Sequence, residues 1–270
     1  MMLIFIKIFI RIKYLVEVFL LREKLSPNEK IQSNLNKKYL IILPHADDEL
    51  IGCNQLLKSS ANCLIINMDM KGGDTFEMHN RRYNELKAYS ESCKKELITL
   101  HQNKTQQLKN IIESFNPNVI CIPSCFDWHP EHFQVMRYLS KACTLLENKS
   151  NKFVIAMYQV SVPLHPNYIN FAIPMSKKAY SNKWNDFTRY YTTQSHLPAY
   201  RFGANERING KLLKSYAAEC YIFITVHEWK SIFEKACTLE MSDILKNNIN
   251  NLSMIREVSL PFYKLCFSPN

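Results

Sequence analysis

The segment YLIILPHADDE at residues 39–49 joins a short apolar run to a strongly polar one, and it decides the fold that we expect. Three further runs share its apolar, β-branched character, namely CLIINM at 63–68, VICIP at 119–123 and FVIAMY at 153–158. Runs that are apolar on both faces are typical of strands in a parallel sheet that helices cover on both sides. The sequence therefore predicts an α/β domain with a mainly parallel sheet and helices on both faces.

The stretches between these runs have helical spacing. In two of them apolar residues recur three or four positions apart, at Leu108, Ile111, Ile112 and Phe115 and again at Val135, Leu139, Ala142 and Leu146. The chain has only 5 glycines in 270 residues, which disfavours a β-sandwich or barrel that turns on glycine every few residues. Helical connections between the strands are therefore expected.

The chain is basic and rich in cysteine. It has 34 Lys and Arg residues against 24 Asp and Glu residues, and the formal net charge of +10 suits an anionic partner. A membrane surface and a phosphorylated substrate both fit, and we do not expect nucleic acid. Most of the 9 cysteines stand among apolar residues, where reduced thiols behave as small hydrophobes. We therefore expect a reducing compartment and a cytoplasmic protein, with peripheral attachment to the inner face of the cell membrane as an option.

The amino terminus is apolar but carries charges. Lys7, Arg11, Lys13 and Glu17 interrupt the apolar residues of segment 3–21. A membrane-spanning helix would have to place these charges near the bilayer centre at a cost of a few kcal/mol each. The same charges disfavour a cleaved signal peptide. An amphipathic helix remains, which either packs on protein or lies on an anionic membrane.

The chain divides into three segments in this interpretation. We expect the amphipathic helix and a linker over residues 1–37, with membrane contact assigned to residues 1–25. Residues 38–225 form the α/β domain. Residues 226–270, with five basic and five acidic side chains, form a helical extension at the carboxyl end.

Two polar clusters follow strands of the predicted sheet. HADDE at 45–49 comes directly after the first run, and DWHPEH at 127–132 comes a few residues after VICIP. The chemistry of open α/β sheets collects at the carboxyl ends of the strands, so both clusters are expected at one edge of the sheet.

These clusters contain the donors of a metal site. His45, Asp48 and His132 offer two imidazoles and one carboxylate, and a fourth position left to water completes the pattern of a catalytic zinc site. Asp47 stays free to transfer protons beside the metal, and His129 can face the other side of the reacting group. The same donor types also hold Fe, Mn or Ni, so zinc is the expected ion among several divalent ones.

At these residues the chain resembles the LmbE/PIG-L family of metal-dependent de-N-acetylases. The pattern of that family is His-Pro-Asp-Asp-Glu after a strand and Asp-x-His-Pro-Asp-His later. The likeness extends over residues 38–225. Further elements in the order of the bacterial polysaccharide-locus branch are Gly72-Gly73-Asp74, Arg82 with Glu85, Met157-Tyr158-Gln159-Val160, Pro166-Asn167, Lys183, Gln194-Ser195, Tyr200 and Ala218-Glu219.

The resemblance implies a Rossmann-like fold and hydrolysis of an N-acetyl group from an amino sugar that is nucleotide-, lipid- or polysaccharide-linked. It implies zinc held by His45, Asp48 and His132. It also implies that Asp47 is the general base and that His129 stabilises the oxyanion. The family's substrates make an N-acetylated sugar the expected partner.

Four further residues are candidates for substrate contact, namely Arg82, Asp127, Trp128 and His165. Arg82 would bind a phosphate or hydroxyl group, unless it is only an exposed helix charge. Trp128 would stack on a sugar ring or pack within the protein. His165 stands near the end of the run at 153–158 and is therefore a candidate for the pocket.

Three positions depart from the family pattern. Ala46 replaces proline and Glu131 replaces aspartate, and both changes are mild. Gln159 replaces the glutamate common in the bacterial branch, which removes a charge and leaves the substrate preference open.

Two other classes of function are alternatives. One is an amidase that acts on a non-sugar or thiol-conjugate substrate with the same metal site. The other is a peripheral membrane or polyanion-binding protein with a vestigial site. A deacetylase of the glycosylphosphatidylinositol pathway would also suit a membrane-associated amino terminus, although the later motifs fit the bacterial branch better.

Overall fold

The structure is a computed structural model of the whole chain. It describes residues 8, 9, 12, 13 and 16 and the ranges 37–146, 152–197, 199–248 and 251–268. Most of the segment predicted to form an amphipathic helix and linker lies outside the described residues.

In the described part of the chain, seven strands form a single sheet with the order β3-β2-β1-β4-β5-β7-β6. The strands are β1 (Lys38–Leu43), β2 (Asn62–Asn67), β3 (Glu96–Thr99), β4 (Val119–Pro123), β5 (Val154–Tyr158), β6 (Phe171–Met175) and β7 (Ala217–Thr225). The first five in the spatial order are parallel, and β7 runs antiparallel to both of its neighbours. The predicted α/β fold with a mainly parallel sheet is confirmed.

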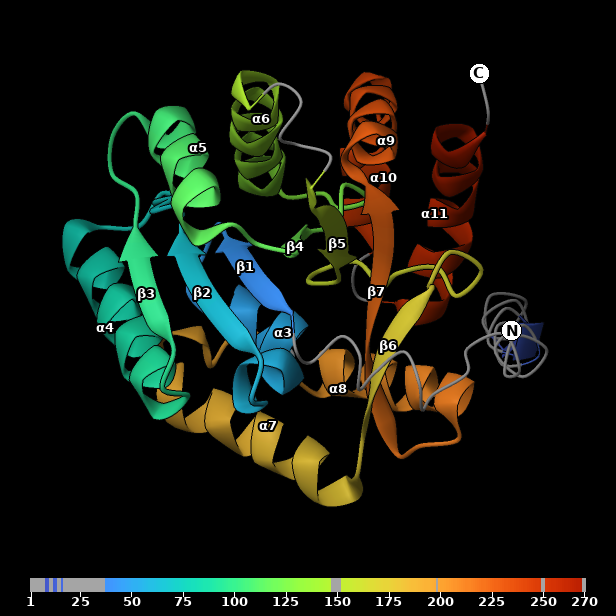
Figure 1. Cartoon of the computed structure of the whole chain (residues 1–270). Helices are drawn as coiled ribbons and strands as arrows, with labels where there is room; N and C mark the ends of the chain where they lie inside the picture. The colour runs from blue at the N-terminus through green and yellow to red at the C-terminus, as the bar shows by residue number, and fades with distance from the viewer. Residues whose placement is uncertain are drawn as a thin grey trace.

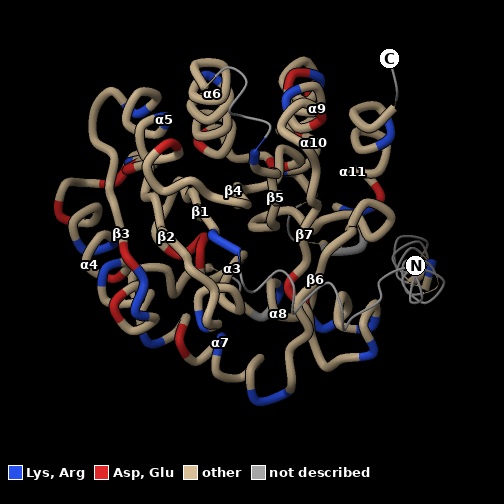
Figure 2. Tube along the Cα trace, in the orientation of Figure 1, with Lys and Arg blue, Asp and Glu red and all other residues tan. Residues whose placement is uncertain are grey.

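Helices cover both faces of this sheet (Figure 1). They are α3 (Asp48–Lys58), α4 (Phe76–Ser92), α5 (Lys104–Phe115), α6 (Pro130–Leu145), α7 (Lys177–Tyr190), α8 (Ala199–Gly210), α9 (Val226–Thr238), α10 (Ser242–Asn248) and α11 (Leu252–Phe267), with short 3-10 turns η2 (Thr192–Gln194) and η3 (Lys211–Leu213). Charged residues lie mainly on these helices, and the strands carry few (Figure 2).

The alternation of side chains along β1 separates two cores. Leu40 and Ile42 belong to the core under α5, α6, α9, α10 and α11, whereas Tyr39 and Ile41 belong to the core under α3, α4, α7 and α8. All four side chains are fully buried. A strand that is buried on both faces reads as a continuous apolar run, and this explains the sequence YLIIL.

The carboxyl-terminal helices share the first of these cores. Trp229 of α9 and Tyr263 of α11 are fully buried and belong to the same cluster as Ile120 of β4. The helical extension predicted for residues 226–270 therefore packs on the sheet, although its boundary with the α/β domain stays a prediction.

The five described residues near the amino terminus are helical. Four of them, Ile8, Phe9, Ile12 and Val16, expose between 49% and 68% of their surface. The fifth, Lys13, forms an ion pair of 2.8 Å with Glu257. Within the ranges that the structure describes, no helix is long and apolar enough to cross a membrane.

Candidate metal and catalytic site

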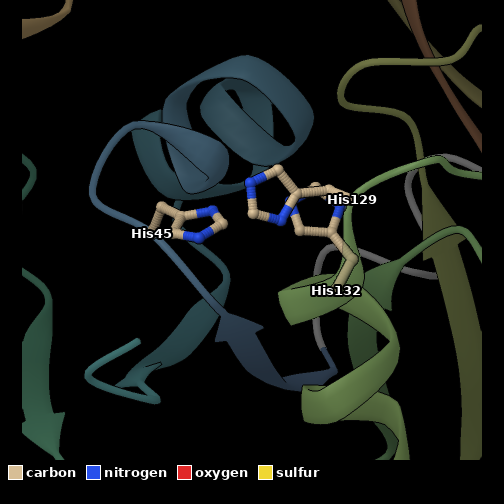
Figure 3. Close-up of side chains that lie close together, drawn as sticks. All are labelled: His45, His129 and His132. Atoms are coloured by element: carbon tan, nitrogen blue, oxygen red, sulfur yellow. The ribbon is translucent and has the colours of Figure 1, made fainter. Parts of the chain in front are cut away.

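The two polar clusters meet at the carboxyl edge of the sheet because β1 and β4 are adjacent parallel strands. His45 lies in the turn between β1 and α3, and His129 is the residue that precedes α6. His132 projects from the first turn of α6. The three imidazoles point toward one another, and one nitrogen of each lies within 4.8 Å of the others (Figure 3).

The carboxylate of Asp48 lies among these rings. Its Oδ2 atom is 3.4 Å from Nδ1 of His45 and 3.7 Å from Nε2 of His132. Ligands at zinc bond lengths of about 2.0–2.1 Å in a tetrahedral arrangement are about 3.4 Å apart. Asp48 thus lies at about this separation from both predicted histidine ligands, and His129 lies beside them as a third imidazole.

A second carboxylate orients His132. Nδ1 of His132 donates to Oδ2 of Asp127 over 2.9 Å, which leaves Nε2 free to face Asp48. The other oxygen of Asp127 accepts the backbone N–H groups of Trp128 and His129 at 2.6 and 3.3 Å. Asp127 is 1% exposed and does not line the pocket. It therefore contacts the predicted ligand His132 and lies away from the space expected for substrate.

Glu131 holds His45 in a similar way. Its Oε2 atom is 2.5 Å from Nε2 of His45, and its Oε1 atom accepts the backbone N–H of Gly72 over 3.0 Å. Burial alone would lower the pKa of His45, but hydrogen bonds with Asp48 and Glu131 raise it to about 10. A cation that binds Nδ1 of His45 must therefore displace a proton.

His129 is neutral and can donate into the pocket. Burial, and then the neighbouring rings of His132 and His45, lower its pKa to about 4. Nδ1 of His129 accepts the backbone N–H of Glu131 over 3.3 Å, so the proton of the neutral ring belongs on Nε2. A neutral N–H donor of this kind suits the stabilisation of an oxyanion.

Asp47 is buried and has an unusual backbone. Its φ angle of 108° lies in the region that favours glycine, and only 3% of its surface is exposed. Burial raises the pKa of its carboxyl group well above the usual value, and the neighbouring carboxylates of Asp48 and Glu49 raise it further. A raised pKa increases the affinity of the carboxylate for a proton, as general-base catalysis requires.

A pocket of about 270 Å³ opens over these residues. It is lined by seven of the residues predicted for the site, namely His45, Asp47, Asp48, Arg82, Trp128, His129 and His132. The other lining residues are Ile51, Gly72, Asp74, Val160, Ser161, Gln194, His196, Leu197 and Phe202.

Arg82 is not a simple exposed helix charge. It forms an ion pair of 2.9 Å with Asp74, and its second terminal nitrogen donates to Gln194 over 3.4 Å. Its Nε atom and Nε1 of Trp128 are buried without a hydrogen-bond partner among the described residues.

His165 lies apart from the pocket. It is 2% exposed, and its ring packs near those of Tyr168 and Tyr263 at centroid distances of 5.9 Å. Burial, and then the charge of Arg256, lower its pKa to about 4. These contacts describe a neutral histidine in a core.

Gln159 also lies outside the pocket lining. Its Oε1 atom accepts hydrogen bonds from Nδ2 of Asn205 over 2.7 Å and from the backbone N–H of Leu164 over 3.4 Å. It is 6% exposed, so a neutral amide suits this buried network without a counter-ion.

The contact between Glu49 and Tyr191 has no signal in the local sequence. Glu49 is fully buried, its Oε1 atom accepts a hydrogen bond from the hydroxyl of Tyr191, and burial raises its pKa to about 8 despite that bond. Tyr191 is 142 positions away in the chain. The segment that follows it forms one wall of the pocket through Gln194, His196 and Leu197.

Several solved structures have a fold similar to that of this chain. No family model and no curated protein matches this chain. The N,N'-diacetylchitobiose deacetylase of Pyrococcus horikoshii, solved with an inhibitor, is 14% identical with a TM-score of 0.58, covering 76% of this chain and 96% of its own. The conserved protein TT1542 of Thermus thermophilus is 17% identical with a TM-score of 0.55, covering 69% and 94%.

A third similar structure is the zinc-inhibited form of teicoplanin deacetylase Orf2. It is 13% identical with a TM-score of 0.51, covering 69% of this chain and 97% of its own. At these identities the likeness concerns the fold alone, and the chain shares the Rossmann-like α/β fold of these structures.

Proposed function

We propose that this protein is a metal-dependent hydrolase that removes the N-acetyl group from an N-acetylated amino sugar. One observation carries the proposal: Oδ2 of Asp48 lies 3.4 Å from Nδ1 of His45 and 3.7 Å from Nε2 of His132. Two histidines and a carboxylate at this spacing fit a zinc ion with one position open, and other divalent ions accept the same donors.

The chain supplies the remaining groups of the reaction. A divalent ion at such a site contributes Lewis acidity toward water and toward a carbonyl oxygen. Asp47 accepts a proton from the attacking water and delivers it to the leaving amine, so that an amide and water become acetate and an amine. The N–H of neutral His129 donates to the oxygen on which negative charge develops.

The pocket supports a sugar as the acetylated substrate. Arg82 and Trp128 both line the pocket, and their side chains carry N–H donors of the kind that pair with the hydroxyl groups of a sugar. The side chains of Gln194 and Ser161 add further polar groups to the lining. Two proteins of similar fold are an N,N'-diacetylchitobiose deacetylase and a teicoplanin deacetylase, which by their names remove acetyl groups. The alternative substrate is a non-sugar or thiol-conjugate amide.

Mass spectrometry tests this proposal. Protein loaded with zinc is incubated with N-acetylated nucleotide sugars, lipid-linked sugars, polysaccharides and a thiol-conjugated acetyl amide. We expect one acetyl group to be lost from a sugar substrate and acetate to be released in equal amount. Loss of acetyl only from the thiol conjugate would support the alternative, and no loss from any amide would contradict the proposed activity.

We further propose that residues 1–25 bring the protein to an anionic membrane surface. The exposed apolar side chains Ile8, Phe9, Ile12 and Val16 recur at helical spacing, and the segment is basic. Phe9→Asn combined with Ile12→Asn should reduce sedimentation with anionic vesicles. The matched control is Phe76→Asn, which changes a phenylalanine that is 80% exposed on another helix. Equal sedimentation of both variants and the wild type would contradict membrane contact through this segment.

A further inference from the structure

We infer that Glu49 and Tyr191 are positioning residues for the general base Asp47. They connect the turn at residues 44–47, called the catalytic turn below, to the wall of the pocket. The inference rests on the proposed function, because it assigns a task to the same base. It concerns two residues that the proposed reaction does not otherwise use.

The turn that carries Asp47 needs support from outside itself. The φ angle of 108° is rare for a residue with a side chain, and such conformations persist only where the surroundings fix them. As the residue that precedes α3, Asp47 makes no capping hydrogen bond with its side chain. The carboxylate is therefore free for chemistry, and the backbone of the turn is held by other groups.

Glu49 supplies that support with one oxygen. Its Oε2 atom accepts the backbone N–H of Asp47 over 3.2 Å, and this contact fixes the turn at its strained residue. Its Oε1 atom accepts the hydroxyl of Tyr191. Through these two contacts the fully buried side chain of Glu49 connects the catalytic turn with Tyr191, which is remote in sequence.

Tyr191 is itself held firmly. The next two residues are bound by Glu85 of α4, whose Oε1 atom accepts the Thr192 hydroxyl at 2.6 Å and the Thr193 backbone N–H at 3.0 Å. Nε2 of Gln194 reaches the carbonyl oxygen of Ala46 over 3.5 Å. The catalytic turn and segment 191–194 are therefore joined at two places.

This arrangement couples substrate binding to the base. Gln194 lines the pocket and accepts a hydrogen bond from Arg82, so a substrate that contacts this wall contacts the segment that also holds Glu49. A shift of Tyr191 would pass through Glu49 to the backbone of Asp47. Small displacements of a positioned group lower turnover strongly, by up to about 10²-fold for 1 Å.

The test is Tyr191→Phe, which removes only the hydroxyl. Tyr190→Phe is the matched control, because it makes the same change at the adjacent residue. We expect Tyr191→Phe to lower kcat by about tenfold or more, with KM and zinc content unchanged, because the buried hydrogen bond that positions Glu49 is lost. We also expect faster amide hydrogen exchange in the peptide that contains residues 44–50. The control should match the wild type in all of these measurements.

A second comparison separates positioning from a general loss of structure. If Tyr191 acts through Asp47, then adding Tyr191→Phe to Asp47→Asn should change kcat by less than about twofold, because the two effects are not additive. An unchanged kcat and unchanged exchange in Tyr191→Phe would overturn the inference. Additive losses, or loss of zinc, would overturn it as well, because the pair would then support the fold or the metal instead of the base.

A different measurement would contradict the proposed function. If wild-type protein releases no acetate from any substrate, the deacetylase proposal is contradicted. The exchange measurement does not depend on activity, and it still decides whether Tyr191 supports the catalytic turn.

Discussion

The carboxylate of Asp127 accepts a hydrogen bond of 2.9 Å from Nδ1 of His132. This contact selects the tautomer in which Nε2 of His132 has a free lone pair directed toward the site. Asp127 is buried and has no place in the pocket lining, so its contribution is made through His132.

Asp127→Ala should therefore weaken metal binding. Partners of this kind typically change metal affinity by about 10- to 100-fold, and we expect a loss of that size in a zinc titration against a competing chelator. Lys246→Ala is a suitable control, since Lys246 lies over the Trp128 ring at 5.6 Å without contacting a predicted ligand. Equal zinc affinity in Asp127→Ala and the wild type would show that His132 does not bind the ion.

Zinc affinity should depend on pH through His45. The pKa of His45 is raised to about 10 in the metal-free protein, so Nδ1 carries a proton at neutral pH. Zinc binding then releases this proton. The loss of one proton from His45 should raise the zinc affinity by about tenfold for each pH unit between pH 6 and 8. Glu131→Gln removes the partner of Nε2, lowers the pKa of His45 and should flatten this dependence. Identical slopes in the two proteins would argue against His45 as a ligand.

Acid should destabilise the fold through His165. Its pKa is about 4 in the folded protein, below the value of 6.5 for the unfolded chain, so the unfolded state binds more protons. The contribution of neutral His165 to the free energy of unfolding is complete above pH 6.5. It is lost as the pH falls toward 4, and it amounts to about 3 kcal/mol in total. His165→Asn should lose less unfolding free energy than the wild type between pH 7 and 4.5 in urea titrations. An equal loss in both proteins would assign the acid sensitivity to other groups.

Much of the fold could be predicted from local sequence. The four quoted apolar runs correspond to β1, β2, β4 and β5, because strands buried on both faces have no polar positions to interrupt them. Strand β3 is a short edge strand with exposed and half-buried residues, and β6 contains Pro174, so neither has that signature. The reversed direction of β7 depends on pairing with distant segments, which periodicity does not report.

Local sequence likewise predicts some residues of the candidate site and misses the contacts of others. His45, Asp47 and Asp48 stand in one turn directly after a strand, so their position at the sheet edge follows from the order of the chain. The contact of Glu49 with Tyr191 depends on where α7 packs, and no local pattern contains that information. The ion pair of Arg82 with Asp74 shows the same limit, since a charge on a helix does not reveal its partner.

The most direct test of the account compares Asp47→Asn with Asp48→Asn in zinc content and turnover. Asp47→Asn keeps the shape of the side chain but cannot accept a proton, so it should retain zinc while kcat falls by about 10²- to 10⁴-fold. Asp48→Asn removes a charged ligand atom and should lose zinc, with part of its activity restored by excess metal. We therefore expect the two adjacent variants to differ in zinc content. Loss of zinc in Asp47→Asn with zinc retained in Asp48→Asn, or full activity in both variants, would contradict it.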